Sequence, residues 1–598
     1  MSSLRALGGR DSGEPAAVQA RAPARTLALR GWPVAAAGFG ALMGIGVGTA
    51  VWVMVVGYSP VPFADRWGEL PFLERAVAGH LHIGDFWAQA NEHRIVVPRI
   101  QFVLEYALFG GRYVFLFSIV ALSCVLIACV VAAVVWLETK DRLLSWAAFC
   151  VAAMATLSPA AEENLTWGLP GLVQVYLFAS IAALAVAVAA QPGRRDSVWT
   201  AVAAASALAA SYSVANGLLL WPLLLVVALA LRLRLRLVAA LAAAGALTWF
   251  SYIWHFEPVA RHASYRSSLE HPLSVAKYVA VYLGGPLHDA GGLKAAGLAG
   301  AVGLILLAVL TVVAWRERAA RPIATIWGAA VALFVLLSAA ETAVGRLNFG
   351  LTQATSSRYE TACAVFWLAL VVGLLRPAGA RVRFSIDVGG RSRSVGFLAV
   401  LALTAVMALA VDLMTLPSGT SLRQTAFDRE LAVVGFRSGV DDPGSVTGTP
   451  PGTPAVARGL AWLRSERLGP WAPSGMVDGS RISLRRPLRN APSCRGQVDA
   501  ADAVPGGTRL RGWIVAPDGV AASHQLAVLA VGRLVTEPVL GLGLVGASRP
   551  DVKAAGAARS SWTGFVAYAR GEPSESVRIV LVAKDHRGTA CTLDTAPA

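Results

Sequence analysis

Long runs of apolar residues constrain the fold of this chain more than any other feature. A helix needs about 20 predominantly apolar residues to cross the hydrocarbon core of a bilayer. Several runs approach that length, and only 15% of the 598 residues are charged, against about 25% in a typical soluble domain. The sequence therefore predicts a polytopic α-helical membrane protein with about eleven spans. The predicted spans are 33–57, 114–136, 143–158, 171–190, 198–213, 217–231, 237–254, 295–315, 323–340, 360–375 and 395–412.

The net charge of +16 is distributed unevenly between the two sets of connecting segments. Segments on the N-terminal side of the predicted membrane hold 20 Lys and Arg in 72 residues, whereas the inter-helix loops of the other side hold 9 in 119. This bias follows the positive-inside rule and places the N-terminus in the cytoplasm. An odd number of spans then places residues 413–598 outside. The positive charge is thus a topology signal, and no nucleic-acid partner is predicted.

The same patterns divide the chain into four predicted regions. The polar, Ala- and Arg-rich tail 1–31 is expected to be cytosolic and disordered, and residues 32–412 form the membrane domain. Residues 413–490 are rich in Gly, Pro and Ser and hold one amphipathic helix at 453–469. Residues 491–598 alternate apolar and polar residues in short runs between turn residues, which predicts an antiparallel β-sandwich.

The six cysteines fall into two groups. Four lie in predicted spans and are expected to be small packing residues. Cys494 and Cys591 flank the β-rich part of the predicted outer domain. An outward domain lies in an oxidising compartment, so we predict a disulfide between them; the alternative is two unpaired thiols. No CxxC-type spacing is present, and no metal site is predicted.

The predicted outer loop 58–99 places five carboxylates, three histidines and four arginines between two apolar runs. A loop that only reverses the chain direction needs no such side chains. Asp65, in the segment FADRW (63–67), follows the first span by about eight residues. A carboxylate just above the membrane can act as a general base on an acceptor hydroxyl. The alternative is a helix N-cap, a position at which Asp is favoured.

A second charged cluster in this loop, NEHRI (91–95), directly precedes an apolar run. Charges at a membrane boundary are costly unless they are paired, which makes them functional candidates. Glu92 or His93 can assist proton transfer, and Arg94 or Arg99 can bind a phosphate through the planar guanidinium. The alternative is a set of ion pairs that anchors the loop at the interface.

The second predicted outer loop carries the adjacent acids Glu162 and Glu163. Asn164 and Trp167 follow them, where a sugar can form hydrogen bonds or stack on a ring. We therefore expect Asn164 and Trp167 to contact the substrate.

The fifth predicted outer loop carries Arg346, Arg358 and Tyr359, the last two within the segment SSRY (356–359). Arg358 lies at the mouth of the tenth predicted span. These arginines are expected to bind a lipid phosphate or pyrophosphate. The alternative is that Arg358 extends its charged end toward the lipid headgroups.

This layout, with FADRW, NEHRI and SSRY, resembles the GT-C class of integral-membrane glycosyltransferases over residues 33–412. The resemblance implies a multi-pass protein of the bacterial inner membrane that uses a polyprenyl-phosphate-linked sugar as donor. The sugar would pass to a glycan or glycolipid acceptor on the outer face by an inverting displacement. Elements of 512–565 also resemble a small β-sandwich appended to bacterial cell-envelope glycosyltransferases, which would either bind carbohydrate or serve as a passive cap.

Carried over by position, Asp65 would be the base, assisted by Glu92 or Glu162. Members of the class often show a compact acidic pair in the first loop, whereas Asp65 has no adjacent acid. Glu69 or a distant carboxylate would then complete the site. Members differ in their use of a divalent metal, and no cofactor is firmly predicted.

Three other functions remain open from the sequence. A transporter or flippase of lipid-linked glycans would place polar residues deep within the spans, yet these are almost purely Ala, Leu and Val. A non-catalytic envelope assembly protein would not need the acidic first loop. A glycan ligase or acyltransferase of the outer face is poorly separated from a glycosyltransferase. The clustering of polar residues at the outer rim favours an enzyme.

Overall fold

The structure is a computed structural model. It describes residues 25–257, 270–374, 392–416, 419–440, 442, 454–472, 491–519, 525–530, 539–571, 577–582 and 589–594. Most of the predicted disordered tail, and much of the predicted linker 413–490, lie outside the described residues.

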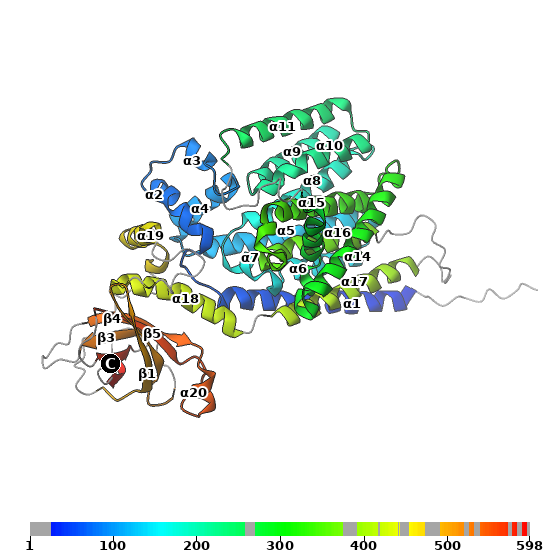
Figure 1. The fold of residues 1–598 in the computed structure, drawn as a ribbon. Helices are drawn as coiled ribbons and strands as arrows, with labels where there is room; N and C mark the ends of the chain where they lie inside the picture. The colour runs from blue at the N-terminus through cyan, green and yellow to red at the C-terminus, as the bar shows by residue number, and fades with distance from the viewer. Residues whose placement is uncertain are drawn as a thin grey trace, which may run out of the picture.

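Long helices that run roughly parallel or antiparallel to one another form the membrane domain (Figure 1). Nine helical segments in the described part of the chain are long and apolar enough to cross a membrane, and they coincide with nine of the predicted spans. The main helices are α1 (Arg25–Val56), α5 (Val114–Thr139), α6 (Arg142–Thr156), α8 (Gly171–Ala189), α9 (Asp196–Ser211), α10 (Leu220–Ala230), α11 (Leu235–Ile253), α13 (Pro272–Leu283), α14 (His288–Glu317), α15 (Ile323–Arg346), α16 (Glu360–Leu374) and α17 (Ser392–Thr415).

The other two predicted spans, 198–213 and 217–231, are not among these nine. They correspond to α9, of 16 residues, and α10, of 11 residues. At 1.5 Å per residue, neither helix reaches the ~30 Å thickness of the hydrocarbon core. The predicted fold class, a helical membrane domain with a C-terminal sheet domain, is confirmed.

Small residues allow the helices of the bundle to approach closely. A Cβ atom on Gly300 of α14 would lie 1.7 Å from the carbonyl oxygen of Ala280 in α13. On Gly328 of α15, it would lie 2.5 Å from the carbonyl oxygen of Ala369 in α16. Helices in lipid associate through such contacts because apolar burial between them contributes little. The Ala-rich runs that identify the spans therefore also set the spacing between them.

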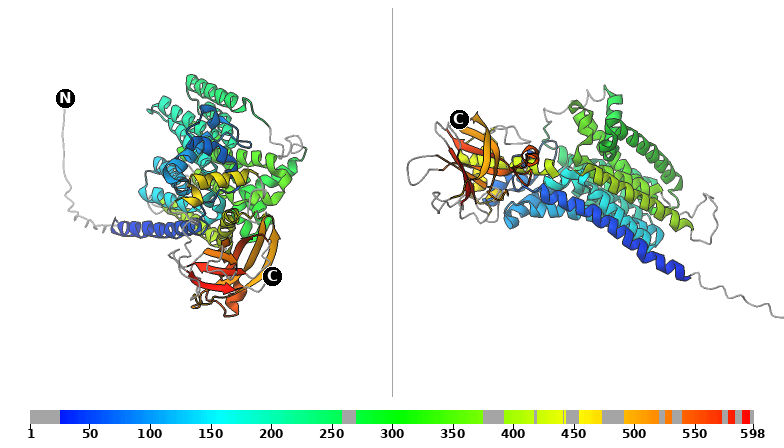
Figure 2. Two further views of the ribbon diagram at one scale, coloured as in Figure 1. Left: turned by 90° about the vertical axis from the view of Figure 1, so that its left-hand side faces the viewer. Right: turned by 90° about the horizontal axis from the view of Figure 1, so that it is seen from below.

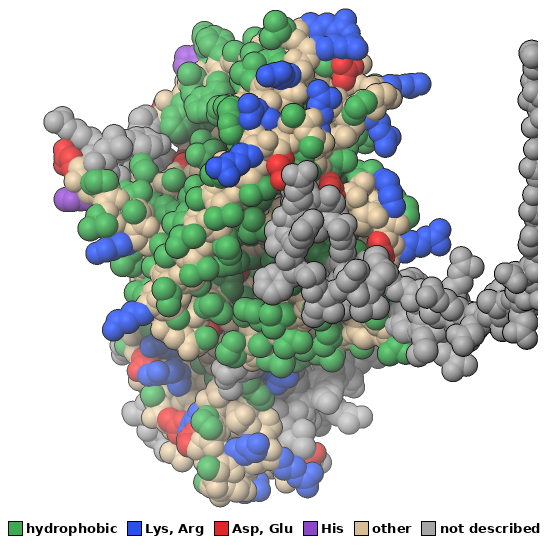
Figure 3. Space-filling view, turned by 90° about the vertical axis from the view of Figure 1, so that its right-hand side faces the viewer, with side chains coloured by type: hydrophobic (Ala, Val, Ile, Leu, Met, Phe, Trp, Pro, Cys, Tyr) green, Lys and Arg blue, Asp and Glu red, His purple; other side chains and the backbone are tan. Residues whose placement is uncertain are grey.

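The two ends of the bundle differ in charge and in the segments that cover them. Figure 3 views the end from which the N-terminal tail leaves, here called the tail end, and Lys and Arg side chains are prominent on it. The helix turns at this end include Lys140, Arg142, Arg232 and Arg318. The opposite end carries the sheet domain, as the right-hand view of Figure 2 shows, and is here called the sheet end.

The first loop folds into a layer of short helices at the sheet end (Figure 1). The layer also includes two helices from the region after the last span, and α19 corresponds to the helix predicted at 453–469. Aromatic and aliphatic residues from all of these segments share one core, in which Trp462 of α19 stacks on Tyr106 at 6.1 Å. The elements are η1 (Ala64–Glu69), α2 (Leu70–Val77), α3 (Ile83–Trp87), α4 (Val96–Phe109), α18 (Gly419–Ser438) and α19 (Pro454–Ser465); α7 (Glu162–Thr166), from the second loop, joins the core of the bundle through Leu165.

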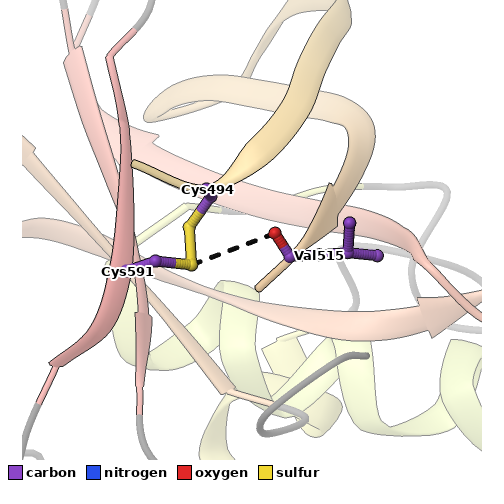
Figure 4. Close-up of a disulfide and its surroundings, with 3 residues drawn as sticks. All are labelled: Cys494, Val515 and Cys591. Carbon is purple, nitrogen blue, oxygen red and sulfur yellow. Dashed lines mark hydrogen bonds between the residues drawn. A yellow bond between two sulfur atoms is a disulfide. The ribbon is translucent and has the colours of Figure 1, made fainter. Parts of the chain in front are cut away.

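The C-terminal domain is one antiparallel sheet of seven strands in the order β1-β2-β5-β4-β3-β6-β7. Its two edges meet, because the backbone N–H of Cys494 donates to the carbonyl of Thr592 at 2.7 Å and Cys494 forms a disulfide with Cys591 (Figure 4). A continuous sheet thus closes on itself, where the sequence predicted a sandwich. The strands are β1 (Arg495–Val504), β2 (Gly507–Val515), β3 (Gln525–Ala530), β4 (Val539–Ala547), β5 (Gly564–Arg570), β6 (Val577–Val582) and β7 (Thr589–Asp594).

Candidate functional site

A cavity of about 820 Å³ opens at the sheet end, between the first loop, α11 and the end of α15. Eight of the eleven predicted catalytic and binding residues line it, from three loops that are far apart in the sequence. These eight are Asp65, Glu92, His93, Arg99, Trp167, Arg346, Arg358 and Tyr359. The structure places Arg94, Glu162 and Asn164 outside the lining.

Asp65 lies in the first turn of η1 and is exposed to the cavity. The N-cap position of η1 is Phe63, and no side chain caps this helix. The predicted alternative, that Asp65 is a helix N-cap, is therefore not what the structure shows. The Asp65 carboxylate makes no hydrogen bond or ion pair with another described residue. Ala64 before it has a φ of +49°, a left-handed conformation that is uncommon for a residue with a side chain and that is often found at functional sites.

Glu92 and His93 form a polar group with Arg346 from the end of α15. The Glu92 Oε1 atom lies 2.7 Å from an Arg346 nitrogen and 3.6 Å from His93 Nε2. The other ring nitrogen, Nδ1, accepts the backbone N–H of Ala215 at 3.1 Å. A nitrogen that accepts carries no proton, so the geometry favours the neutral imidazole with its proton on Nε2, facing Glu92.

Arg358 lies between aromatic rings on the wall of the cavity. Its guanidinium carbon is 5.7 Å from the ring centre of Trp167 and 5.5 Å from that of Tyr359. Its Nε lies 3.6 Å from a carboxylate oxygen of Glu163. Cation–π contacts and one weak ion pair thus hold the Arg358 head at the cavity wall.

Asn164 supports Arg358 from behind and does not face a ligand. Its side chain is fully buried, and its amide donates to the carbonyl of Arg358 at 3.0 Å and to the Thr361 hydroxyl at 2.9 Å. The expectation that Asn164 contacts the substrate is therefore replaced by a supporting role. Glu162 also lies outside the cavity lining, close enough to Arg429 of α18 for the two charges to interact.

Arg94 and Arg99 also differ from their predicted role of phosphate binding. Arg94 is 4% exposed and donates to the carbonyls of Tyr252, at 2.7 Å, Trp87, at 2.6 Å, and Trp254. Burial lowers the pKa of Arg94, and the three carbonyls satisfy its donors. Arg94 thus clamps the loop onto the end of α11.

Arg99 has a similar structural role at the start of α4. It forms a two-pronged ion pair with Glu69, at 2.9 and 3.2 Å, and donates to the carbonyls of Asp85, Phe86 and Ala88. Because these partners occupy its planar guanidinium, Arg99 stabilises the loop, although it also lines the cavity. The same pair holds Glu69 in place at the cavity wall.

The sequence interpretation missed Glu341, which lines the cavity from α15. Its Oε2 atom is buried and has no hydrogen-bond partner among the described residues. The acid lies directly after the apolar stretch assigned to the ninth span. An ionisable residue at the end of a membrane helix is itself a functional signal, and it could have identified Glu341.

In the part of the chain that the structure describes, no three His, Cys, Asp or Glu side chains converge closely enough to hold a metal ion. Of the four acids that line the cavity, Glu69 and Glu92 are paired with arginine.

Comparisons with known proteins add one similarity. No protein-family model and no curated protein match the chain. Among solved structures, the chain is similar to the archaeal oligosaccharyltransferase AglB from Archaeoglobus fulgidus, in complex with an inhibitory peptide and a dolichol-phosphate. The TM-score is 0.36 and the sequence identity 13%, and the match covers 74% of this chain and 61% of that chain. The chain thus spans about three fifths of the length of that protein.

Proposed function

We propose that this protein is a membrane glycosyltransferase that moves a sugar from a polyprenyl-phosphate carrier to an acceptor hydroxyl at the outer face of a bacterial inner membrane. Asp65 is the general base. The observation that carries the proposal is the position of Asp65, which is exposed and unpaired among the described residues on the same cavity as Arg346 and Arg358.

The choice of Asp65 follows from comparison with the other acids of the cavity. Glu69 is paired with Arg99, and Glu92 with Arg346. Both Glu69 oxygens and Oε1 of Glu92 already accept arginine N–H groups, which leaves less room for an acceptor hydroxyl. Glu341 has one oxygen buried without a partner, which limits its access to an acceptor. Asp65 is the acid best placed to meet a hydroxyl.

Arg346 and Arg358 are proposed to bind the phosphate of the carrier. Each contacts a carboxylate through one nitrogen, whereas a guanidinium has five N–H donors in a planar fork. The remaining donors suit phosphate oxygens, which arginine binds in pairs. Trp167, which flanks Arg358, gives the sugar a ring face on which to stack.

The reaction is a single inverting displacement. The acceptor oxygen attacks the anomeric carbon while Asp65 takes its proton, and the bond between this carbon and the phosphate oxygen breaks. The carrier leaves as a phosphate whose added negative charge the arginines stabilise. Donors aimed at developing charge contribute about a hundredfold to a thousandfold each to kcat.

The test compares wild type with Asp65→Asn in membranes from a strain that lacks the protein. The substitution keeps the size of the side chain and removes the base, so transfer is expected to fall by about a hundredfold to ten-thousandfold. Glu74→Gln is the matched control, because Glu74 is an exposed acid of the same loop outside the cavity lining. Full activity of a normally expressed Asp65→Asn protein would reject Asp65 as the base. Absence of any transfer by the wild type would favour a transporter or an assembly protein.

A further inference from the structure

Helix α18 connects the sheet domain to the loop that carries Asp65. One face of α18 packs on β4 and β5. The Ser438 hydroxyl accepts the N–H of Leu542 at 3.0 Å, and the carbonyl of Ser438 accepts Arg570 Nε at 2.8 Å. Directly after α18, Asp442 accepts the Tyr568 hydroxyl at 2.8 Å. These bonds fasten α18 to the sheet.

The other face of α18 presents Arg429 to the membrane domain. Arg429 is 4% exposed, and its guanidinium carbon lies 4.0 Å from the ring centre of Phe63. One terminal nitrogen donates to the carbonyl of Thr166 at 3.3 Å, whereas the buried Nε has no hydrogen-bond partner among the described residues. The ring of Phe63 and the nearby charge of Glu162 therefore both stabilise this buried cation.

The contact continues from Phe63 into the cavity. Phe63 meets Trp167 edge to face at 5.1 Å, and Trp167 in turn faces Arg358. Arg429, Phe63, Trp167 and Arg358 thus form a continuous series of cation and ring contacts, here called the stack. Phe63 is two residues before Asp65, and Ala64 between them has a left-handed backbone conformation. Such a conformation persists only where surrounding contacts fix it.

We propose that Arg429 is a positioning residue: it holds Phe63, and through it sets the position of Asp65 and of the cavity wall. The sheet domain then acts on the reaction through α18 without touching the substrate. This inference rests on the proposed function for its turnover readout, but the position of the loop can also be measured directly.

The first experiment uses the full-length protein in lipid nanodiscs with Arg429→Gln and Arg429→Lys. Displacement of a catalytic group by about 1 Å costs roughly a hundredfold in rate, so kcat of Arg429→Gln should fall roughly tenfold to a hundredfold. The KM for the lipid donor should change little, because Arg346 and Arg358 remain. Amide hydrogen exchange across residues 60–69 should become faster. Arg429→Lys keeps the charge over the ring and should recover part of the loss.

Arg423→Gln is the matched control, since Arg423 is an exposed arginine of α18 that faces Trp562 of the sheet domain. It removes the same charge from the same helix without touching the stack. Wild-type turnover and wild-type exchange in Arg429→Gln would overturn the proposal. An equal loss in Arg423→Gln would do the same, because the effect would then belong to the helix as a whole.

Phe63→Leu tests the stack from its other side and covers the case in which Arg429→Gln folds poorly. If Arg429 acts through Phe63, the double variant should be no slower than the worse single variant. Losses that multiply would contradict the proposal. If the wild type shows no glycosyl transfer, the proposed function fails, while hydrogen exchange across 60–69 still decides whether Arg429 holds the loop.

Discussion

The bundle and the layer at its sheet end are held together by different interactions. In the bundle, helices meet through Gly and Ala, as where α14 crosses α13 at Gly300. In the layer, buried ions organise the chain: Arg94 binds three carbonyls, and Glu105, fully buried, accepts the N–H groups of Tyr113 and Leu116. Small-residue contacts suit lipid, where unpaired charge is costly, whereas ions can order irregular loops near water. The functional cavity lies where these two regions meet.

The largest effect is expected from a methyl group at the closest contact of the bundle. In Gly300→Ala the new Cβ overlaps the Ala280 carbonyl, so α13 and α14 must separate. Because the overlapping atom at 1.7 Å is backbone and cannot rotate away, the cost should exceed the ~1–3 kcal/mol typical of overpacking, and we expect loss of most folded protein in size-exclusion chromatography. Gly48→Ala is the control, because a Cβ there meets nothing within 4 Å. Equal amounts of folded protein from the two variants would show that the bundle deforms more easily than the layer does.

The next effect concerns the sheet domain alone. The disulfide closes a loop with a sequence separation of 97, for which the chain-entropy relation gives about 4–5 kcal/mol. A Cys494→Ala, Cys591→Ala variant should lower the stability of the sheet domain by up to that amount and leave the bundle unchanged. Limited proteolysis in urea, followed domain by domain, measures both. Cys129→Ala, which removes a free cysteine of α5, should change the stability of neither the sheet domain nor the bundle. If bundle and sheet instead unfold together in the double variant, the two regions are one cooperative unit.

Arg94→Gln tests whether ions organise the layer. Three backbone carbonyls lose a charged donor, and a buried unsatisfied group costs about 1–3 kcal/mol, so we expect a loss of about 3 kcal/mol in thermal or denaturant unfolding. Arg75→Gln is the control, because the ion pair of Arg75 with Asp85 is on the surface and such pairs contribute about 0–1 kcal/mol. Similar losses of stability in both variants would show that buried and surface arginines stabilise the layer equally.

The smallest effect is a pH dependence in α18. Burial raises the pKa of Glu430 from its usual 4.5 to about 8. A raised pKa means that the folded protein binds a proton more tightly than the unfolded chain does. The protonated Glu430 therefore makes its full contribution to the stability of the fold below pH 4.5, and this contribution is lost as the pH rises through about 8. Glu430→Gln should raise the melting temperature relative to wild type at pH 8.5 but not at pH 4.5. The control is Glu466→Gln, at an exposed acid, which should leave the melting temperature unchanged at both pH values.

The sequence predicted the spans well because a bilayer imposes a minimum length and an apolar composition on each helix. It also predicted residues from three separate loops that meet at one cavity, since polar groups at helix ends were treated as candidates. The roles within the cavity were harder to predict. Arg94 and Arg99 look like phosphate binders, but Arg94 donates to backbone carbonyls, one of them at Tyr252, 158 residues away, and Arg99 is paired with Glu69. No local pattern encodes such a contact.

Other misses have similar physical causes. Glu341 was overlooked because it marks the end of an apolar run, and Asn164 was assigned to the substrate because its partner Thr361 is distant in the sequence. Arg429 lies in a helix whose composition gives no sign that one face contacts the membrane domain. Packing between distant segments decides these cases.

The closed edge of the sheet also has a mechanical consequence. Because Cys591 in the last strand is joined to Cys494 just before the first, tension applied at the C-terminal end passes through sulfur to the segment that leads back to α18. Apart from the pairs that residues 592–594 make with β6, the strands between the two cysteines are bypassed by this load. A partner that pulls on the end of the chain would therefore transmit force to the membrane domain without peeling the sheet apart.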